Sequence, residues 1–208
     1  MSTAVSSTPL LVVITAPSGV GKSTLCDNMH SALPDVSRAV TCTTREPRSG
    51  EVEGVDYYFL GKEEFLARVD SDEFLENALV HGNHYGVLKS ELRAKLAGGG
   101  DVLLNIDVQG AATIRERAAT DPVLSRSLLT VFLCPPSLKE LEHRLRGRGT
   151  DTDEAIAKRL AIAKDEMAQA EKFDHTLTSQ TREADAGRLL GIIESVRLAK
   201  REAILTNG

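Results

Sequence analysis

A short loop near the start of the chain has the residue types and spacing that bind phosphate groups. Its two glycines let consecutive backbone N–H groups turn toward an anion, because neither glycine carries a Cβ. Its lysine can reach the β- and γ-phosphates of a nucleotide, and the serine after it offers Mg²⁺ a hydroxyl oxygen. We therefore predict that ATP and Mg²⁺ bind here, with Lys22 as a catalytic cation and Ser23 as a metal ligand. The predicted ATP-binding residues are Ala16, Pro17, Ser18, Gly19, Val20, Gly21, Lys22, Ser23 and Thr24.

The residues on either side of this loop predict the elements that hold it. Leu10 to Ile14 form a continuous apolar run, which is typical of a parallel strand buried on both faces. Apolar residues recur at helical spacing from Leu25 to Leu33, and Pro34 ends that pattern. A strand, a glycine-containing loop and a helix in this order favour a phosphate loop over the alternative, a bare turn that matches by chance. Ala16 stands where the commonest form of the motif has its first glycine, so we expect its φ to be negative.

The remaining apolar segments alternate between strand-like and helix-like patterns. Strands are predicted over Val102–Asp107 and Leu128–Cys134, and helical patterns over Leu138–Leu145, Ala155–Phe173 and Leu189–Ile204. This alternation predicts an α/β fold in which helices flank a parallel β-sheet on both faces.

One acidic residue stands where a magnesium site needs it. Asp107 closes a predicted strand, and we expect its carboxylate to orient water on Mg²⁺ as a second metal-site residue. The alternative is an aspartate that only ends the strand or caps the next helix.

Composition and charge exclude several other classes of function. Lys and Arg total 25 against 30 Asp and Glu, a net charge of −5, so no overall basic field favours nucleic acid or anionic lipid. The three cysteines are scattered without a CxxC pair, which favours free thiols in a reducing compartment. The apolar run at residues 10–14 is too short for a signal peptide or a membrane span. We expect a cytoplasmic protein with no nucleic-acid or membrane partner, and we leave open whether it is a monomer or a homo-oligomer.

Residues 41 to 86 interrupt the alternation and carry the most specific motifs of the chain. Thr41-Cys42-Thr43-Thr44-Arg45-Glu46-Pro47-Arg48-Ser49-Gly50-Glu51, followed by Gly54-Val55-Asp56-Tyr57-Tyr58-Phe59, closely resembles the nucleotide-monophosphate lobe of guanylate kinases. The resemblance runs from about Leu10 into the last helical segment, in the order of that family. Its further stretches are Phe74-Leu75-Glu76, Gly82-Asn83-His84-Tyr85-Gly86, Ile106-Asp107-Val108-Gln109-Gly110 and Arg144-Leu145-Arg146-Gly147-Arg148-Gly149-Thr150.

The resemblance implies how the phosphate of an acceptor nucleotide would bind. Arg45, Arg48, Tyr57 and Tyr85 match the family residues that hold the phosphate of GMP, and Arg45 is also expected to be catalytic. Two guanidinium groups and two phenols suit a dianion. The alternative for both arginines is a solvated loop in which they pair with neighbouring glutamates.

The resemblance also implies how guanine would be recognised. Glu76 matches the residue whose carboxylate accepts hydrogen bonds from N1–H and the exocyclic amine of guanine, whereas adenine presents an acceptor at N1. Thr41 keeps a hydroxyl where a serine usually donates to guanine O6. Asn105 replaces an acidic residue of many relatives, and Val87 replaces a small hydroxyl residue. Asn105 and Asp107 complete the predicted substrate-binding set, and the alternative for Glu76 is a surface glutamate.

Arginines in the last third of the chain match the lid of the same family. Arg144, Arg148 and Arg159 would close over the triphosphate and neutralise charge on the transferring phosphoryl group. Closure would also exclude water, whose attack would hydrolyse ATP. The alternative is a basic helical face that pairs with nearby acidic residues. Ser179 takes the place of an asparagine near the adenine of ATP.

These predictions combine into a P-loop NTPase core with an inserted GMP-binding lobe and an arginine-rich lid. The predicted reaction transfers the γ-phosphoryl group of Mg·ATP to GMP or dGMP, so the expected partners are these small molecules. Two alternatives stay open: a non-catalytic module that binds a phosphorylated partner, and a kinase of another small phosphorylated acceptor. The single guanylate kinase-like domain, residues 1–208, is divided into a core (9–40, 88–136 and 160–208), a lobe (41–87) and a lid (137–159).

Overall fold

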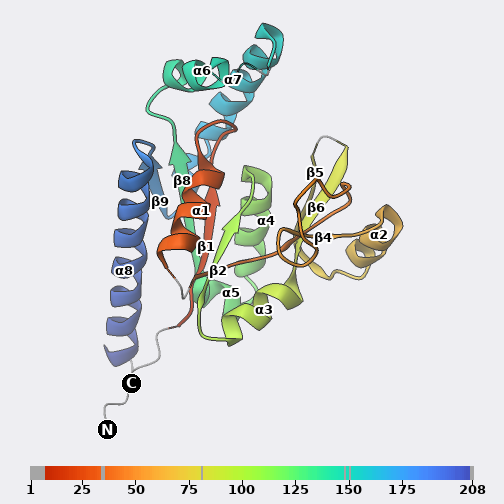
Figure 1. The fold of residues 1–208 in the computed structure, drawn as a ribbon. Coiled ribbons are helices and arrows are strands. Elements are labelled where there is room, and N and C mark those ends of the chain that lie inside the picture. The colour runs from red at the N-terminus through yellow and green to blue at the C-terminus, as the bar shows by residue number, and fades with distance from the viewer. Residues whose placement is uncertain (1–7, 34–35, 81, 148, 150, 207–208) are drawn as a thin grey trace.

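A parallel sheet runs through the centre of the computed structural model, which describes residues 8–33, 36–80, 82–147, 149 and 151–206 (Figure 1). In spatial order its strands are β2 (Val36–Arg38), β7 (Asp101–Asn105), β1 (Leu11–Thr15), β8 (Leu128–Cys134) and β9 (His175–Thr178). β1 lies in the middle, between β7 and β8, and all its residues are buried. The α/β class and the central position predicted for the apolar run are confirmed.

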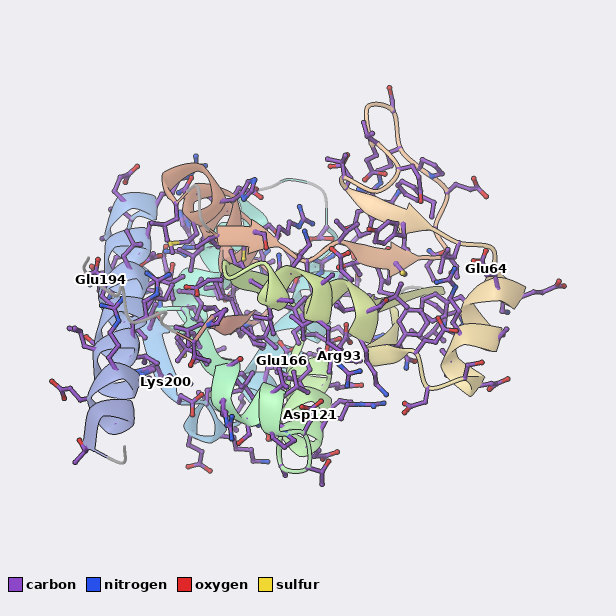
Figure 2. All side chains as sticks on the ribbon, turned by 90° about the horizontal axis from the view of Figure 1, so that it is seen from below. Glu64, Arg93, Asp121, Glu166, Glu194 and Lys200 are labelled. Carbon is purple, nitrogen blue, oxygen red and sulfur yellow. The ribbon has the colours of Figure 1, made fainter. Side chains whose placement is uncertain are left out.

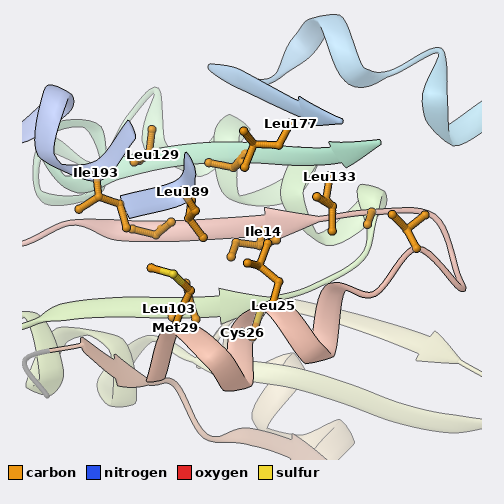
Figure 3. Close-up of a cluster of buried hydrophobic side chains, with 14 of the residues drawn as sticks. Ile14, Leu25, Cys26, Met29, Leu103, Leu129, Leu133, Leu177, Leu189 and Ile193 are labelled. Atoms are coloured by element: carbon orange, nitrogen blue, oxygen red, sulfur yellow. The ribbon is translucent and has the colours of Figure 1, made fainter. Parts of the chain in front are cut away.

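Helices cover both faces of this sheet, as the alternating pattern predicts. Side chains of β1 alternate between the two faces because successive residues of a strand point to opposite sides. Ile14, shown in Figure 3, packs with Val12 against the helices of one face. Leu11 and Val13 pack with the helices of the other face. Burial of each such side chain contributes about 1.5–3 kcal/mol, so the strand that leads into the phosphate loop is held firmly from both sides. The first face carries α1 (Lys22–Ala32) and α8 (Arg182–Thr206), and the second carries α3 (Lys89–Ala97), α4 (Val108–Ala118) and α5 (Pro122–Ser127).

The segment with weak periodicity forms a second, smaller sheet to one side of the first (Figure 1). It has a core of its own, in which Phe65 and Phe74 stack with ring centroids 4.4 Å apart beside Cys42 and Leu88. This lobe therefore has a small core of its own, and Leu75 and Val87 of its strands also pack into the core of the central sheet. In spatial order its strands are β4 (Tyr57–Phe59), β3 (Thr41–Thr43), β6 (Asn83–Leu88) and β5 (Phe74–Val80), and α2 (Lys62–Asp70) packs on them.

Two helices beyond β8 lie at the end of the central sheet where its strands finish (Figure 1). They are α6 (Leu138–Arg146) and α7 (Asp153–Met167), and the 3₁₀ turn η1 (Ala170–Lys172) connects them to β9. No helix in the described part of the chain is long and apolar enough to cross a membrane.

Some element boundaries differ from the predicted ones. The predicted helix Ala155–Phe173 ends earlier, at Met167, because the chain must turn into β9. Phe173 still reaches the apolar core from that turn, where its ring lies 5.2 Å from that of Phe132. The predicted strand that was to end at Asp107 ends instead at Asn105, and Asp107 caps the next helix.

The buried carboxylate of Asp101 ties three separate segments together. Asp101 is 3% exposed, accepts a hydrogen bond from the backbone N–H of Leu10 at 2.9 Å, and pairs with Arg197 of α8 at 2.6 Å. The Arg197 side chain is about a third exposed, so loss of Asp101 mainly leaves the buried N–H of Leu10 without its acceptor. We expect Asp101→Ala to lower the free energy of unfolding by about 1–3 kcal/mol, measured by urea denaturation.

The matched control is an ion pair on the surface. Glu64 pairs with Arg68 at 2.7 Å, but both side chains are at least a third exposed. Glu64→Ala should cost less than about 1 kcal/mol. Equal losses for the two variants would contradict the role given to burial at Asp101.

Candidate active site

A cleft opens between the carboxyl ends of β1 and β7 and the second sheet, which is where parallel α/β folds bind their ligands. Its volume is about 470 Å³. Residues predicted from separate motifs of the sequence line it side by side, so folding brings the proposed donor and acceptor groups together. The predicted site residues in this lining are Lys22, Ser23, Thr41, Tyr57, Glu76, Tyr85, Asn105 and Asp107.

The phosphate loop has the backbone conformation that its glycines allow. Gly19 and Gly21 have φ values of +97° and +113°, in the left-handed region that side chains disfavour. A Cβ on Gly19 would also lie 2.7 Å from Leu145 of α6, so this glycine gives the helix room to pack on the loop. Ala16 has a negative φ, as expected, because the one described non-glycine residue with a positive φ is Asp72.

A second hollow of about 360 Å³ lies directly over this loop. Its walls combine backbone of the loop with two carboxylates from distant elements, Asp107 and Glu166. An anion that entered it would meet loop N–H groups and the positive end of the α1 dipole. The other lining residues are Ala16, Pro17, Ser18, Gly19, Gly21, Lys22, Ser23 and Thr24.

Lys22 is the first residue of α1, and its side chain is half-buried where the two hollows meet. Its Nζ donates a hydrogen bond to the backbone carbonyl of Ile106 at 2.5 Å. Burial lowers the pKa of Lys22, and this effect is opposed by nearby acidic groups that include Asp107, Glu166 and Glu76. The ammonium group is thus poorly hydrated and would gain strongly from a phosphate oxygen.

Asp107 both caps a helix and lines the site, the two roles that the sequence left as alternatives. Its Oδ1 accepts a hydrogen bond from the N–H of Gly110 at 2.7 Å, which caps α4, while the residue also lines both hollows. Across the cleft, the Asn105 amide donates to Ser23 Oγ at 3.4 Å. Ser23 and Asp107 therefore offer oxygen donors close to the phosphate loop, and such donors fit Mg²⁺.

The described residues do not form a complete metal cage. Nowhere among them do three or more His, Cys, Asp or Glu side chains gather closely enough to hold an ion. This fits Mg²⁺ in particular, because proteins usually bind it through one or two side chains together with substrate phosphates and water.

Glu76 of β5 is the buried carboxylate of the cleft, with 4% of its surface exposed. Burial and, next, the neighbouring Asp107 raise its pKa to about 7, although Lys22 acts in the opposite direction. The carboxylate lies against Gly110 of α4, where an added Cβ would be 2.8 Å from Glu76 Oε2. A buried carboxylate without a side chain opposite it can accept hydrogen bonds from a ligand, so the surface-glutamate alternative is wrong.

The second sheet contributes a cluster of one arginine and two tyrosines. The rings of Tyr57 and Tyr85 meet edge to face at 6.2 Å, and the Arg45 guanidinium lies 5.3 Å from the centre of the Tyr57 ring. Arg45 also pairs with Glu51 at 2.8 Å, which raises the pKa of Arg45 and lowers that of Glu51. Arg48 is exposed and is not part of the cleft lining, although its backbone N–H binds Glu51.

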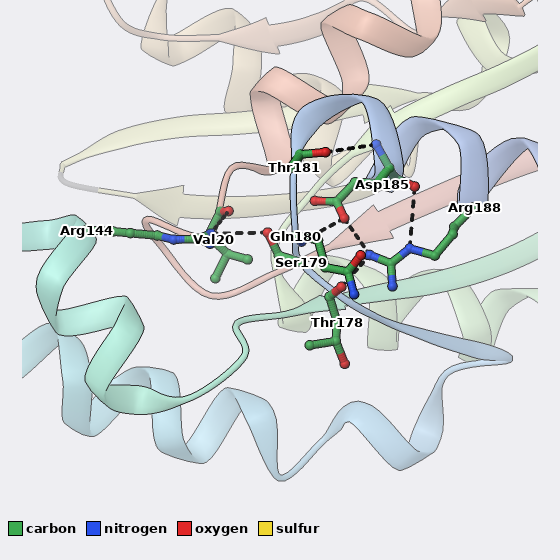
Figure 4. A network of polar contacts seen from close by, with 9 residues as sticks. Val20, Arg144, Thr178, Ser179, Gln180, Thr181, Asp185 and Arg188 are labelled. Atoms are coloured by element: carbon green, nitrogen blue, oxygen red, sulfur yellow. Dashed lines mark hydrogen bonds and ion pairs between the residues drawn. The ribbon is translucent and has the colours of Figure 1, made fainter.

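Two of the predicted lid arginines reach toward the phosphate loop, and Figure 4 shows the contacts of Arg144. Arg144 of α6 donates to the backbone carbonyl of Val20 and to Ser179 Oγ, both at 3.1 Å. Arg159 of α7 donates to Ser18 Oγ at 3.4 Å and pairs with Asp151. Arg144 and Arg159 therefore contact the loop and its surroundings. Arg148, the third predicted lid arginine, lies outside the described residues.

Several lining residues were not predicted from the sequence. A third hollow of about 310 Å³ beside Arg144 and Ser179 is lined by Gln180, Arg182 and Asp185. Glu166 in the hollow over the phosphate loop and Arg38 in the main cleft were likewise not predicted. None of them stands in a recognisable local pattern: Gln180 lies in the loop before α8, and the others reach their sites from helices or strands with ordinary charge spacing. Val87, by contrast, is fully buried in the apolar core and does not line the cleft.

Comparisons with known proteins agree with this geometry. A family model described as guanylate kinase matches residues 8–196. A guanylate kinase of Bifidobacterium longum is 46% identical over 88% of this chain and 92% of its own length. One from Aromatoleum aromaticum is 44% identical over 90% of this chain and 89% of its own.

A solved structure is similar to the fold as well. The crystal structure of guanylate kinase from Anaplasma phagocytophilum matches with a TM-score of 0.69 and 30% identity, over 92% of this chain and 87% of that one. The match of the family model over most of the chain, together with these relatives, shows that the chain belongs to the guanylate kinase family.

Proposed function

We propose that this chain transfers the γ-phosphoryl group of ATP to GMP and thereby produces ADP and GDP. It acts on dGMP too, since none of the proposed contacts involves the 2′-hydroxyl. The observation that carries the proposal is the single cleft in which Glu76, the two tyrosines and Lys22 meet. The membership of the guanylate kinase family supports the same reaction. We place the reaction in the purine nucleotide metabolism of the cytoplasm.

Three parts of the chain share the work in this proposal. Residues 9–40, 88–136 and 160–208 form the core that binds ATP, residues 41–87 form the lobe that binds GMP, and residues 137–159 form the lid. The small apolar core around Phe65 supports the treatment of residues 41–87 as a lobe with packing of its own. The contacts of Arg144 with Val20 and Ser179 support a lid that rests beside the donor site.

The acceptor end of the cleft would hold GMP by its phosphate and its base. Arg45, Tyr57 and Tyr85 bind the phosphate, and Arg48 joins them if its exposed side chain turns inward. Ionised Glu76 accepts from N1–H and the amine of guanine, and Thr41 donates to O6. Asn105 and Asp107 complete this binding set between acceptor and donor.

The donor end would hold ATP on the phosphate loop, from Ala16 to Thr24, with the lid arginines over it. Lys22 stabilises charge on the phosphoryl oxygens as the bond to the leaving phosphate weakens, and Arg144, Arg148 and Arg159 add to that stabilisation. Ser23 and Asp107 would hold Mg²⁺, which when bound neutralises the negative charge of the phosphate groups. Because the transition state is loose, alignment and charge supply most of the rate, and no strong base is required.

A panel of acceptors tests the proposed function. ADP release from Mg·ATP should be fast with GMP and dGMP, slower with IMP, which lacks the exocyclic amine, and near background with AMP, UMP and CMP. No release with any acceptor would favour a binding module that does not catalyse. Release only with another acceptor would show that the cleft reads a different base.

The raised pKa of Glu76 predicts a pH dependence for GMP binding. Only the ionised carboxylate can accept both guanine N–H groups, and with a pKa of about 7 it is mostly protonated at pH 6 and mostly ionised at pH 8. We therefore expect kcat/KM for GMP to rise by about tenfold between these pH values. The phosphate of GMP also titrates in this range, so the profile should be divided by that of Glu76→Gln. A ratio that stays flat with pH would contradict the prediction.

A further inference from the structure

One face of α7 points two charged side chains of opposite sign toward the phosphate loop. Arg159 and Glu166 are seven residues apart, which places them on the same side of a helix, two turns from each other. Arg159 reaches Ser18 Oγ at 3.4 Å, and Glu166 lines the hollow over the loop together with Asp107. Figure 2 labels Glu166 in the middle of the molecule, between Glu194 on α8 and Glu64 on α2.

The Glu166 carboxylate has no partner that would explain this position. It is half-buried, and within the described chain it accepts no hydrogen bond and forms no ion pair. Burial raises the pKa of Glu166, Lys22 opposes this rise, and Asp107 adds to it. Lys22 lies near enough to oppose this rise in pKa, but no ion pair joins Lys22 and Glu166 among the described residues.

Water ligands of Mg²⁺ at this subsite would need hydrogen-bond acceptors, which Glu166 could supply. Mg²⁺ gives up its hydration water reluctantly and usually keeps several water ligands, each of which donates hydrogen bonds. Asp107 already accepts the capping hydrogen bond of α4 through Oδ1, so part of its acceptor capacity is committed. Glu166 stands in the same hollow with both carboxylate oxygens available.

We propose that Glu166 is a positioning residue of the magnesium subsite: its carboxylate accepts hydrogen bonds from the water ligands of Mg²⁺ that Ser23 and Asp107 help to hold. This role rests on the proposed function, in which Mg²⁺ accompanies ATP. Groups that orient metal ligands from outside the coordination shell commonly change metal affinity or activity by about 10–100-fold when removed.

The test measures how much Mg²⁺ strengthens the binding of ADP. Calorimetric titrations with ADP in EDTA and with ADP in excess Mg²⁺ give the magnesium-dependent gain in affinity for the wild type, Glu166→Gln and Asp165→Asn. Asp165 is the adjacent residue, is exposed and does not line the hollow, so its variant removes the same charge elsewhere on α7. We expect the gain to fall by about tenfold or more in Glu166→Gln and to stay at the wild-type value in Asp165→Asn.

The binding of metal-free ADP distinguishes a positioning role of Glu166 from a general effect of its substitution on folding. It should bind Glu166→Gln as well as it binds the wild type, and Glu166→Asp, which withdraws the carboxylate by one methylene, should lose part of the gain. The proposal would be overturned if the magnesium-dependent gain in ADP affinity of Glu166→Gln equalled that of the wild type. It would also be overturned if the variant lost ADP affinity equally with and without Mg²⁺. Either of these two results would leave the proposed phosphorylation of GMP by the wild type intact. If Mg²⁺ does not strengthen the binding of ADP to the wild type at all, the metal must be removed from the proposed function as well.

Discussion

Lys22→Ala should lower kcat for GMP phosphorylation by about 10³-fold or more. Among the residues that the structure describes, the half-buried Lys22 is the cation that lines both the hollow over the phosphate loop and the cleft with Glu76, where the phosphoryl group would pass. Alanine removes that charge at the point where negative charge redistributes. The measurement is steady-state ADP release from Mg·ATP at saturating GMP.

The fold should survive this substitution, because burial of the lysine is itself unfavourable and its loss frees only the carbonyl of Ile106. Lys62→Ala is the matched control, since Lys62 also begins a helix but is exposed on α2, far from the cleft. Thermal melting should show both variants folded. More than a tenth of wild-type turnover in Lys22→Ala would remove the lysine from the mechanism.

Glu76→Gln should lower the preference for GMP over AMP, expressed as the ratio of kcat/KM values, by about 10²–10³-fold. The carboxylate offers two acceptors to the two N–H groups of guanine, whereas the amide offers one acceptor and one donor. The amide donor would face guanine N1–H and repel it, but it would match the acceptor at adenine N1. Turnover with GMP should therefore fall while turnover with AMP rises.

Two further variants test whether position as well as charge matters at Glu76. Glu73→Gln is the control, because Glu73 lies three residues earlier, is about half exposed and pairs with Arg68 at the surface. Gly110→Ala keeps Glu76 but places a methyl group 2.8 Å from Oε2, so the carboxylate must move. Gly110→Ala should lower the ratio in the same direction, and an unchanged ratio in Glu76→Gln would show that guanine is read by other groups.

The core and the phosphate loop could be predicted because their determinants are local. A strand buried on both faces must be apolar throughout, as Leu11–Thr15 nearly is, and a loop that turns N–H groups toward phosphate needs glycine where φ is positive. The resemblance to a family added the residues of the second lobe. Six of the eight predicted substrate-binding residues line one cleft, namely Thr41, Tyr57, Glu76, Tyr85, Asn105 and Asp107.

What escaped prediction depends on contacts between distant parts of the chain. The strands Thr41–Thr43 and Tyr57–Phe59 have three residues each, which is too few for a period of two to stand out. Glu166 lies on a helix whose charges are ordinary in sequence, and only the fold turns it toward the loop. Asp107 ends no strand, because the chain leaves the sheet two residues earlier to begin α4.

The close approach of Gly19 to Leu145 has a mechanical consequence. Because Gly19 has no Cβ, Leu145 of α6 packs directly on the backbone of the phosphate loop. Any small displacement of that backbone, such as nucleotide entry would produce, is passed to the helix by direct steric push rather than through a relay of side chains. Helix α6, next to the donor site, thus rests on the loop that an entering nucleotide would contact.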